Sequence, residues 1–114
     1  MSISYSDAGE LRTIVVSGRL DVDGTDSVAS KLVELTGEPK KGVVVDLSSL
    51  KFLASIGIRA LVAAAKAVKA RGGKLVLVVD SSSSVMMSIK ATGVDQLVPV
   101  FDDSDDAERA AAAA

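Results

Sequence analysis

One serine in this sequence stands where a hydroxyl group could act as a chemical switch. Ser55 precedes a long run of helix-forming residues, so we expect it at the N-terminus of a helix. There the hydroxyl can cap free backbone N–H groups of the first turn. It could also carry a phosphate, because the N-terminus of a helix tolerates an anion. Such a phosphate would leave the fold intact but place charge at the edge of an apolar interface.

Most other side chains that perform chemistry are missing. The chain has no histidine and no cysteine, which excludes a Ser-His-Asp triad, an imidazole base, a thiolate metal site and a disulfide framework. The segment Gly72-Gly73-Lys74 is not a phosphate-binding loop, because no glycine stands five residues before Gly73. We therefore expect a protein that is not an enzyme, with no catalytic residue, no metal site and no cofactor.

Acidic residues offer two weaker candidates. Asp46 ends a predicted buried strand, as does the phosphoacceptor of response-regulator receivers, but residues 15–18 lack the acidic pair that would hold magnesium. We expect Asp46 instead to support the loop before Ser55 by hydrogen bonding. The aspartates at 102, 103, 105 and 106 are interpreted as complementing a helix dipole rather than binding a cation.

Length and composition favour one small domain that binds protein. The 114 residues are expected to form a single domain, 1–114, with a core of small branched side chains, since 48% are hydrophobic and only 3% aromatic. A net charge of −2 argues against nucleic acid as a partner. No basic leader and no apolar run of about 18–20 residues are present, so we expect a cytoplasmic protein without a membrane partner.

Alternating strands and helices must position these residues. Apolar runs between turns predict strands at 2–6, 11–17, 42–47, 74–79 and 97–101. Helical spacing and glycine stops predict helices at 23–36, 55–71, 84–91 and 103–114. The two central strands are apolar on both faces, as in a parallel sheet. The fold class is therefore α/β, with a mixed, mostly parallel sheet of about five strands and about four helices.

The predicted helix at 55–71 has two apolar sides. At about 100° per residue, the side expected to face the core carries Ile58, Leu61, Val62, Ala65 and Val68. The opposite side, flanked by Arg59 and Lys66, is a strip of Ile56, Ala60, Ala63, Ala67 and Ala70. Alanine is simply the best helix former, yet an apolar patch with a charged rim is also typical of a protein-binding surface. The pattern alone leaves both interpretations open.

Several segments resemble one protein family. Residues 43–50 (VVVDLSSL) and 52–58 (FLASIGI) resemble the central motif of the STAS domain family, which includes bacterial anti-sigma factor antagonists. Residues 18–21 (GRLD), 73–77 (GKLVL) and 91–97 (ATGVDQL) resemble further parts of the family pattern. The resemblance covers nearly the whole chain and implies a single STAS-type domain.

The resemblance also implies a function. In the family, an unphosphorylated antagonist binds an anti-sigma factor of the serine-kinase type and so releases a sigma factor; the kinase phosphorylates a serine at a helix start, and a serine phosphatase resets the cycle. Ser55 matches that serine and Gly57 the family glycine, whereas Ala54 and Ile56 replace a common aspartate and a common serine or threonine. The expected partner-binding residues are Asp21, Ala54, Ser55, Ile56, Gly57, Arg59, Ala60, Ala63, Lys66 and Ala67.

A second class of function stays open. A STAS module can also serve as a scaffold or as a subunit of a stress-sensing or lipid-transport complex, and Ser55 would then never be modified. A weak homodimer is compatible with the sequence under either alternative.

Overall fold

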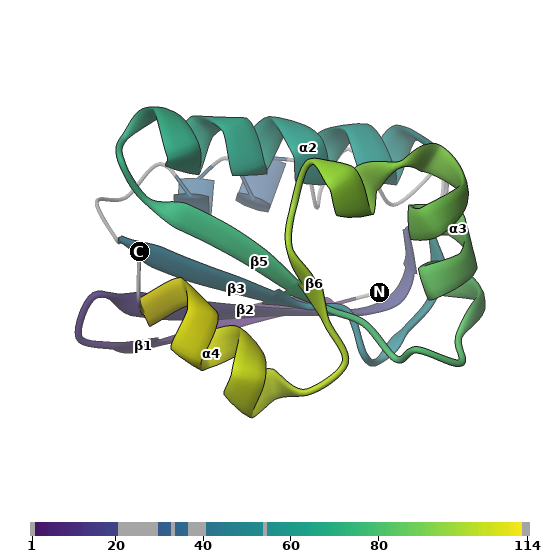
Figure 1. The fold of residues 1–114 in the computed structure, drawn as a ribbon, viewed down its shortest axis with the longest axis horizontal. Coiled ribbons are helices and arrows are strands. Elements are labelled where there is room, and N and C mark those ends of the chain that lie inside the picture. The colour runs from purple at the N-terminus through teal and green to yellow at the C-terminus, as the bar shows by residue number, and fades with distance from the viewer. Residues whose placement is uncertain (1, 21–29, 33, 37–40, 54, 113–114) are drawn as a thin grey trace.

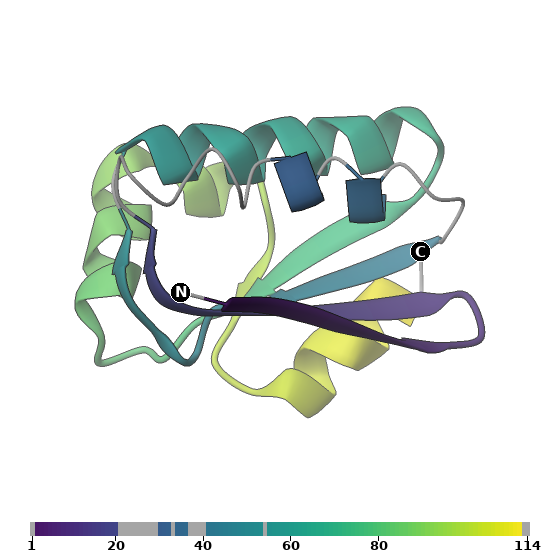
Figure 2. The ribbon, with the colours of Figure 1, turned by 180° about the vertical axis from the view of Figure 1, so that it is seen from behind.

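Figure 1 shows a twisted sheet with helices on both of its faces. The structure is a computed structural model, and it describes residues 2–20, 30–32, 34–36, 41–53 and 55–112. Helix α2 (Ser55–Ala70) lies on one face together with the helical residues 30–32 and 34–36. Helix α3 (Ser84–Thr92) lies at one end of the sheet, and helix α4 (Ser104–Ala112) covers the opposite face (Figures 1 and 2).

The sheet is mixed and mostly parallel, as predicted. Its strands within the described residues are β1 (Ser2–Ala8), β2 (Leu11–Leu20), β3 (Gly42–Asp46), β4 (Leu50–Leu53), β5 (Lys74–Val78) and β6 (Val100–Phe101). Their order is β1-β2-β3-β5-β6, and β4 pairs with the far end of β2. The β1–β2 pair is antiparallel, and the other described pairs are parallel.

Strand β2 is longer than predicted, since it continues past residue 17 to Leu20. Gly18 adopts φ 91°, and the pairing register shifts between Gly18 and Arg19, so the strand bends at a bulge and continues to Leu20. Beyond the bulge it pairs with β4, a strand that the sequence pattern does not predict. Leu50 and Leu53 at the two ends of β4 are buried, and the two residues between them are exposed. The segment therefore lacks the alternation of buried and exposed residues by which a strand is recognised in a sequence.

The predicted strand at 97–101 is shorter in the structure. Residues Val94–Gln96 form a 3-10 turn, and the N–H groups of Leu97 and Val98 both donate to the Val94 carbonyl oxygen at 2.9 Å. Only Val100–Phe101 pairs with β5. Pro99 has no backbone N–H group, so it cannot donate a hydrogen bond to β5 and extend the strand. Its carbonyl oxygen does accept a hydrogen bond from Leu77 N–H, at 2.9 Å. The predicted helices at 55–71 and 84–91 are confirmed to within one residue at each end. The predicted helix at 103–114 begins one residue late, at Ser104, and its last two residues lie outside the described residues, as do residues 23–29 of the predicted helix at 23–36.

Side chains of the central strands fill two cores, which confirms that both faces of these strands are buried. Val43 and Val45 of β3 point to the larger core, which lies against α2. The smaller core lies against α4 and consists of Val44, Val76, Val78, Ala107 and Ala111. Helix α4 also lies very close to the start of β3, where a Cβ on Gly42 would be 2.7 Å from the Ala111 carbonyl oxygen. Glycine at this position therefore permits the contact.

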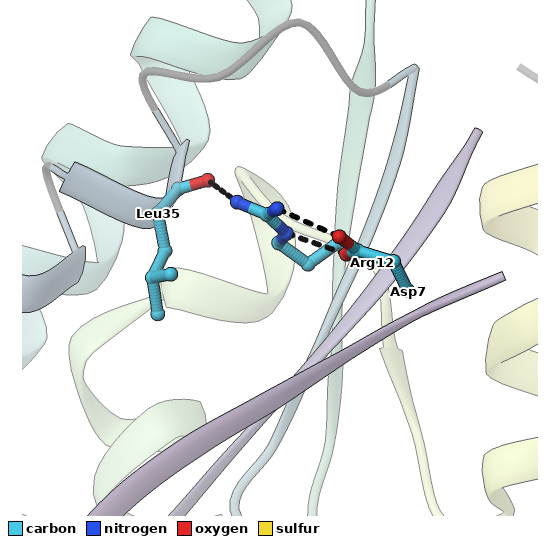
Figure 3. A network of polar contacts seen from close by, with 3 residues as sticks. All are labelled: Asp7, Arg12 and Leu35. Carbon is cyan, nitrogen blue, oxygen red and sulfur yellow. Dashed lines mark hydrogen bonds and ion pairs between the residues drawn. The ribbon is translucent and has the colours of Figure 1, made fainter. Parts of the chain in front are cut away.

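A buried arginine joins the first hairpin to the helical segment that includes Leu35. The hairpin turn has only two residues, Gly9 and Glu10, and the register therefore sets Asp7 opposite Arg12. Arg12 is 2% exposed, and its Nε and Nη2 donate to the two Asp7 carboxylate oxygens at 2.6 and 2.8 Å. Its Nη1 donates to the Leu35 carbonyl oxygen at 3.0 Å (Figure 3). The guanidinium carbon also lies 4.5 Å from the centre of the Tyr5 ring.

Helix α3 begins with a side-chain cap. Ser83 Oγ accepts a hydrogen bond from Met86 N–H at 3.2 Å and donates one to the Asp80 carbonyl oxygen at 2.7 Å. Just before it, the backbone N–H and the hydroxyl of Ser82 donate to the Asp80 carboxylate, and these bonds lower the pKa of Asp80. The hydrogen bonds of Asp80, Ser82 and Ser83 thus stabilise both the turn and the first turn of α3.

Replacing Ser83 with alanine should lower the free energy of unfolding by about 1 kcal/mol, because a first-turn N–H group loses its acceptor. Urea denaturation measures the change. Ser84→Ala is the matched control, since Ser84 is exposed and no cap hydrogen bond involves its side chain. We expect that control to change the free energy by less than about 0.5 kcal/mol. Equal losses in the two variants would contradict a capping role.

Candidate functional site

Strands β2 and β4 together position the start of helix α2. Leu50, Phe52 and Leu53 of β4 pair with Gly18, Arg19 and Leu20 of β2. Helix α2 then begins at Ser55, only two residues after β4 ends. Because β4 is held against β2 and its two end residues lie in the core, the first turn of α2 has a defined place at this end of the sheet. The predicted position of Ser55 at a helix N-terminus is confirmed.

Four of the predicted partner-binding residues lie partly or wholly outside the described residues. Asp21 and Ala54 are not described at all, and for Ser55 and Ile56 only the backbone is described. The six others lie on α2 and are described in full: Gly57, Arg59, Ala60, Ala63, Lys66 and Ala67. The part of the site that can be analysed is therefore the helix surface that follows Ser55.

Burial along α2 corrects the predicted orientation of the helix. Ala60 is half-buried and packs against the larger core, so its placement on the exposed strip was wrong. Gly57 and Ala64 are buried, whereas Val62 and Ala65 are only partly buried. The helix is rotated relative to the prediction because small side chains can sit on its buried side, where they allow close packing. The size of a side chain alone was a poor guide to the buried face.

The exposed part of α2 is a narrow strip with basic residues beside it. Ala63, Ala67 and Ala70 are exposed, and so are Arg59 and Lys66. Helix α2 contains no acidic residue, in its first turn or elsewhere. The partial positive charge of its N-terminus is thus not neutralised by a carboxylate of the helix itself. This surface can accept an apolar partner, and its N-terminal end can accept an anion.

Asp46 shapes the turn that leads into β4. Its Oδ1 accepts hydrogen bonds from the Ser48 backbone N–H at 2.9 Å and from the Ser48 hydroxyl at 2.6 Å. The Leu50 N–H donates to the Leu47 carbonyl oxygen at 3.0 Å in the same turn, and both leucines are buried. The Asp46 carboxylate therefore supports the turn between β3 and β4. Residue 54, immediately before Ser55, lies outside the described residues, so support of that loop by Asp46 stays a prediction.

Phe52 is a surface residue near this site that the sequence analysis did not single out. It lies on β4, three residues before Ser55, and is 37% exposed. A large apolar side chain at a surface contributes to a contact site where it adjoins other apolar surface. The signal in the sequence was an aromatic residue between Lys51 and the helix start, but it could be recognised only once β4 was known to be a strand.

The acidic residues near the C-terminus lie at the start of α4. Among the described residues, no group of three or more acidic side chains is arranged to hold a metal ion. Asp103 instead accepts a hydrogen bond from Asp105 N–H at 2.9 Å, and Asp105 and Asp106 stand in the first turn of α4. The interpretation of these aspartates as partners of a helix N-terminus is thus confirmed for Asp103, Asp105 and Asp106, and it stays a prediction for Asp102. Across the part of the chain that is described, every helix is too short or too polar to cross a membrane.

The fold is an α/β domain with helices on both faces of a mixed sheet. Its strand order is β1-β2-β3-β5-β6, and the short strand β4, which pairs with β2, leads into the long helix α2. The family model of the STAS domain matches residues 4–107. The chain therefore belongs to the STAS domain family. A sequence search of curated proteins found no match.

Solved structures share this fold at low sequence identity. An anti-sigma factor antagonist from Mycobacterium paratuberculosis is 24% identical, with a TM-score of 0.87 over 96% of this chain and 92% of that one. The phosphorylated form of the Bacillus cell fate determinant SpoIIAA is 15% identical, with a TM-score of 0.69 over 96% and 99%. A sulfate transporter family protein from Wolinella succinogenes is 19% identical, with a TM-score of 0.76 over 91% and 86%. These likenesses establish the fold.

Proposed function

We propose that this protein is an anti-sigma factor antagonist, that residues 1–114 act as one domain, and that it functions in the cytoplasm by binding protein rather than by catalysis. Its partner would be an anti-sigma factor of the serine-kinase type, and binding would release a sigma factor. The observation that carries the proposal is the position of Ser55 as the first residue of α2, the helix that also carries the exposed strip of Ala63, Ala67 and Ala70.

The switch follows from the electrostatics of the helix start. The kinase would transfer the γ-phosphoryl group of ATP to the Ser55 oxygen, which gives up its proton, and ADP would leave. First-turn N–H groups and the helix dipole would stabilise the new phosphate, so the domain would stay folded. The same phosphate would have to lose water if a partner covered the strip, and that desolvation opposes binding. A serine phosphatase would restore the binding form by hydrolysis.

Similar proteins support the proposal without establishing it. One of the structures with this fold is an anti-sigma factor antagonist, and another is known in a phosphorylated form. The fold also occurs in a sulfate transporter family protein, which favours a second candidate function, that of a scaffold or a subunit of a larger complex. In that case the α2 surface would bind its partner permanently, and Ser55 would serve only as a helix-start residue.

The variant Ser55→Asp separates the two functions. The regulator proposal predicts that Ser55→Asp weakens binding to the cognate serine-kinase anti-sigma factor by about 100-fold, since a charge must be buried at the interface. Ser55→Ala should bind within about threefold of the unchanged protein. Isothermal titration calorimetry measures both, and mass spectrometry after incubation with kinase and ATP locates the phosphate.

Ser84→Asp is the matched control, because Ser84 is the first residue of α3 just as Ser55 is the first residue of α2. It adds the same charge to a helix start away from the proposed interface and should leave the affinity unchanged. Thermal unfolding should show that all three variants fold. Full affinity in folded Ser55→Asp would refute the switch and favour the scaffold.

A further inference from the structure

A second surface of α2 lies beside the strip, on the flank that faces the segment before β6. Three adjoining hollows open there, with volumes of about 420, 150 and 360 Å³, and Leu97 lines all three. Val62 lines two of them. Together the hollows form one groove along α2, which we call the Leu97 groove. The groove borders the exposed strip, because Ala63 lines one of the three hollows.

The groove has an apolar centre that water covers in the isolated chain. Leu97 is 69% exposed, although its neighbour Val98 is buried in the core. It is held outward by the turn in which the N–H groups of residues 97 and 98 bond to Val94. Leu97 adjoins Val62, which lines two of the same hollows, so the two side chains belong to one apolar surface. A partner that covered this surface would remove apolar area from water, which favours binding.

The rim of the groove carries charge of one sign only. Arg59, Lys66, Lys69 and Lys74 line the hollows, and no described residue that lines them is acidic. None of the four forms an ion pair with another described residue. The chain as a whole has a net charge of −2, so this clustering of positive charge does not reflect overall composition. Interfaces pair such a patch with opposite charge on the partner.

We propose that the Leu97 groove binds an acidic amphipathic helix of a partner protein. The cations on α2 stand at positions 59, 66 and 69, so they follow one side of the helix for about 15 Å at 1.5 Å per residue. A partner helix of about three turns spans that length. Its apolar side chains would cover Leu97 and Val62, and its carboxylates would meet the four cations, which is the usual way in which a helix occupies a groove.

A synthetic peptide tests this assignment directly. The probe is a fluorescent 14-residue peptide with leucines at helical spacing on one face and glutamates on both flanks, and the control is a scrambled peptide of the same composition. Fluorescence anisotropy should show at least tenfold tighter binding of the ordered peptide, and added salt should weaken it through screening. Amide chemical shifts should change for residues 58–74 and 92–99.

Variants outside the α2 strip locate the binding. The double variant Lys69→Glu/Lys74→Glu should weaken peptide binding by at least about tenfold, and Leu97→Ser by about fivefold. Lys41→Glu/Lys51→Glu makes the same change of net charge at two exposed lysines that line none of the three hollows and should have no effect. Ser55→Asp should bind the peptide normally, so failure of the groove and failure of the Ser55 switch are distinguishable.

Four results would overturn the proposal. The first is no binding at about 1 mM ordered peptide, and the second is equal binding by the Lys69→Glu/Lys74→Glu variant. The third is binding to phosphatidylglycerol vesicles but not to the peptide, which would assign the groove to a lipid surface. The fourth is self-association in ultracentrifugation that this double variant abolishes, without peptide binding. That result would assign the groove to a second copy of this chain.

Discussion

Replacing Arg12 with alanine should lower the free energy of unfolding by about 3 kcal/mol, because it removes the centre of a buried polar network. The variant loses two hydrogen bonds to Asp7, one to the Leu35 carbonyl oxygen, and the contact with the Tyr5 ring. The side chain is 2% exposed, so its removal also leaves a cavity that the strands cannot easily close. Equilibrium denaturation in guanidinium chloride measures the loss.

Two further substitutions at Arg12 separate charge from volume. Arg12→Met fills much of the space without a charge, and the Asp7 carboxylate, 32% exposed, can regain water. We therefore expect Arg12→Met to lose only about half as much stability as Arg12→Ala. Arg12→Lys keeps the charge but cannot form the paired hydrogen bonds of a planar guanidinium, so it should also be less stable than the unchanged protein. A loss below about 1 kcal/mol in Arg12→Ala would show that the network contributes little.

Replacing Leu61 with alanine should cost about 3 kcal/mol of unfolding free energy. Leu61 is 1% exposed and lies on α2 in the middle of the larger core. Removing most of its side chain leaves a void between the helix and the sheet and loses apolar burial. The helix that carries Ser55 would then be held less firmly. Thermal and urea denaturation, monitored by circular dichroism, measure the change.

Leu97→Ala is the matched control, because it makes the same chemical change at a leucine that is 69% exposed. It should alter stability by less than about 0.5 kcal/mol. The comparison also shows that substitutions in the Leu97 groove can be interpreted as effects on binding rather than on folding. Comparable losses at the two positions would mean that Leu97 packs far more tightly than its exposure indicates.

The fold could be predicted because its central strands carry an unambiguous pattern. The runs at 42–47 and 74–79 are apolar on both faces, and helical segments separate them. Strand β4 could not be predicted, since it is four residues long with two exposed residues in its middle. The burial of Arg12 was also hidden. A charged residue in a strand indicates a solvent-facing position, unless the hairpin register is known to place Asp7 opposite it.

The candidate site could be predicted only in part. A serine before a long run of helix formers was enough to locate the start of α2, and the structure agrees. The exposed face of that helix differs from the predicted one, because the helix is rotated so that Ala60 and Ala64 pack toward the core. The groove was not foreseen, because Leu97 was assigned to a strand. Only the turn at residues 94–98, a feature of tertiary packing, places that leucine on the surface.

Strand β2 is bonded to three other strands, and this has a consequence for the order in which the chain assembles. Its pairing with β1 closes over a two-residue turn and loses little chain entropy. Its pairing with β3 must close over residues 21–41 and its pairing with β4 over residues 21–49, and such long-range closure slows strand pairing. We therefore expect the local hairpin to form before the long-range pairings. The start of α2 would then reach its final place only after β2 has paired with β4, the strand that leads into it.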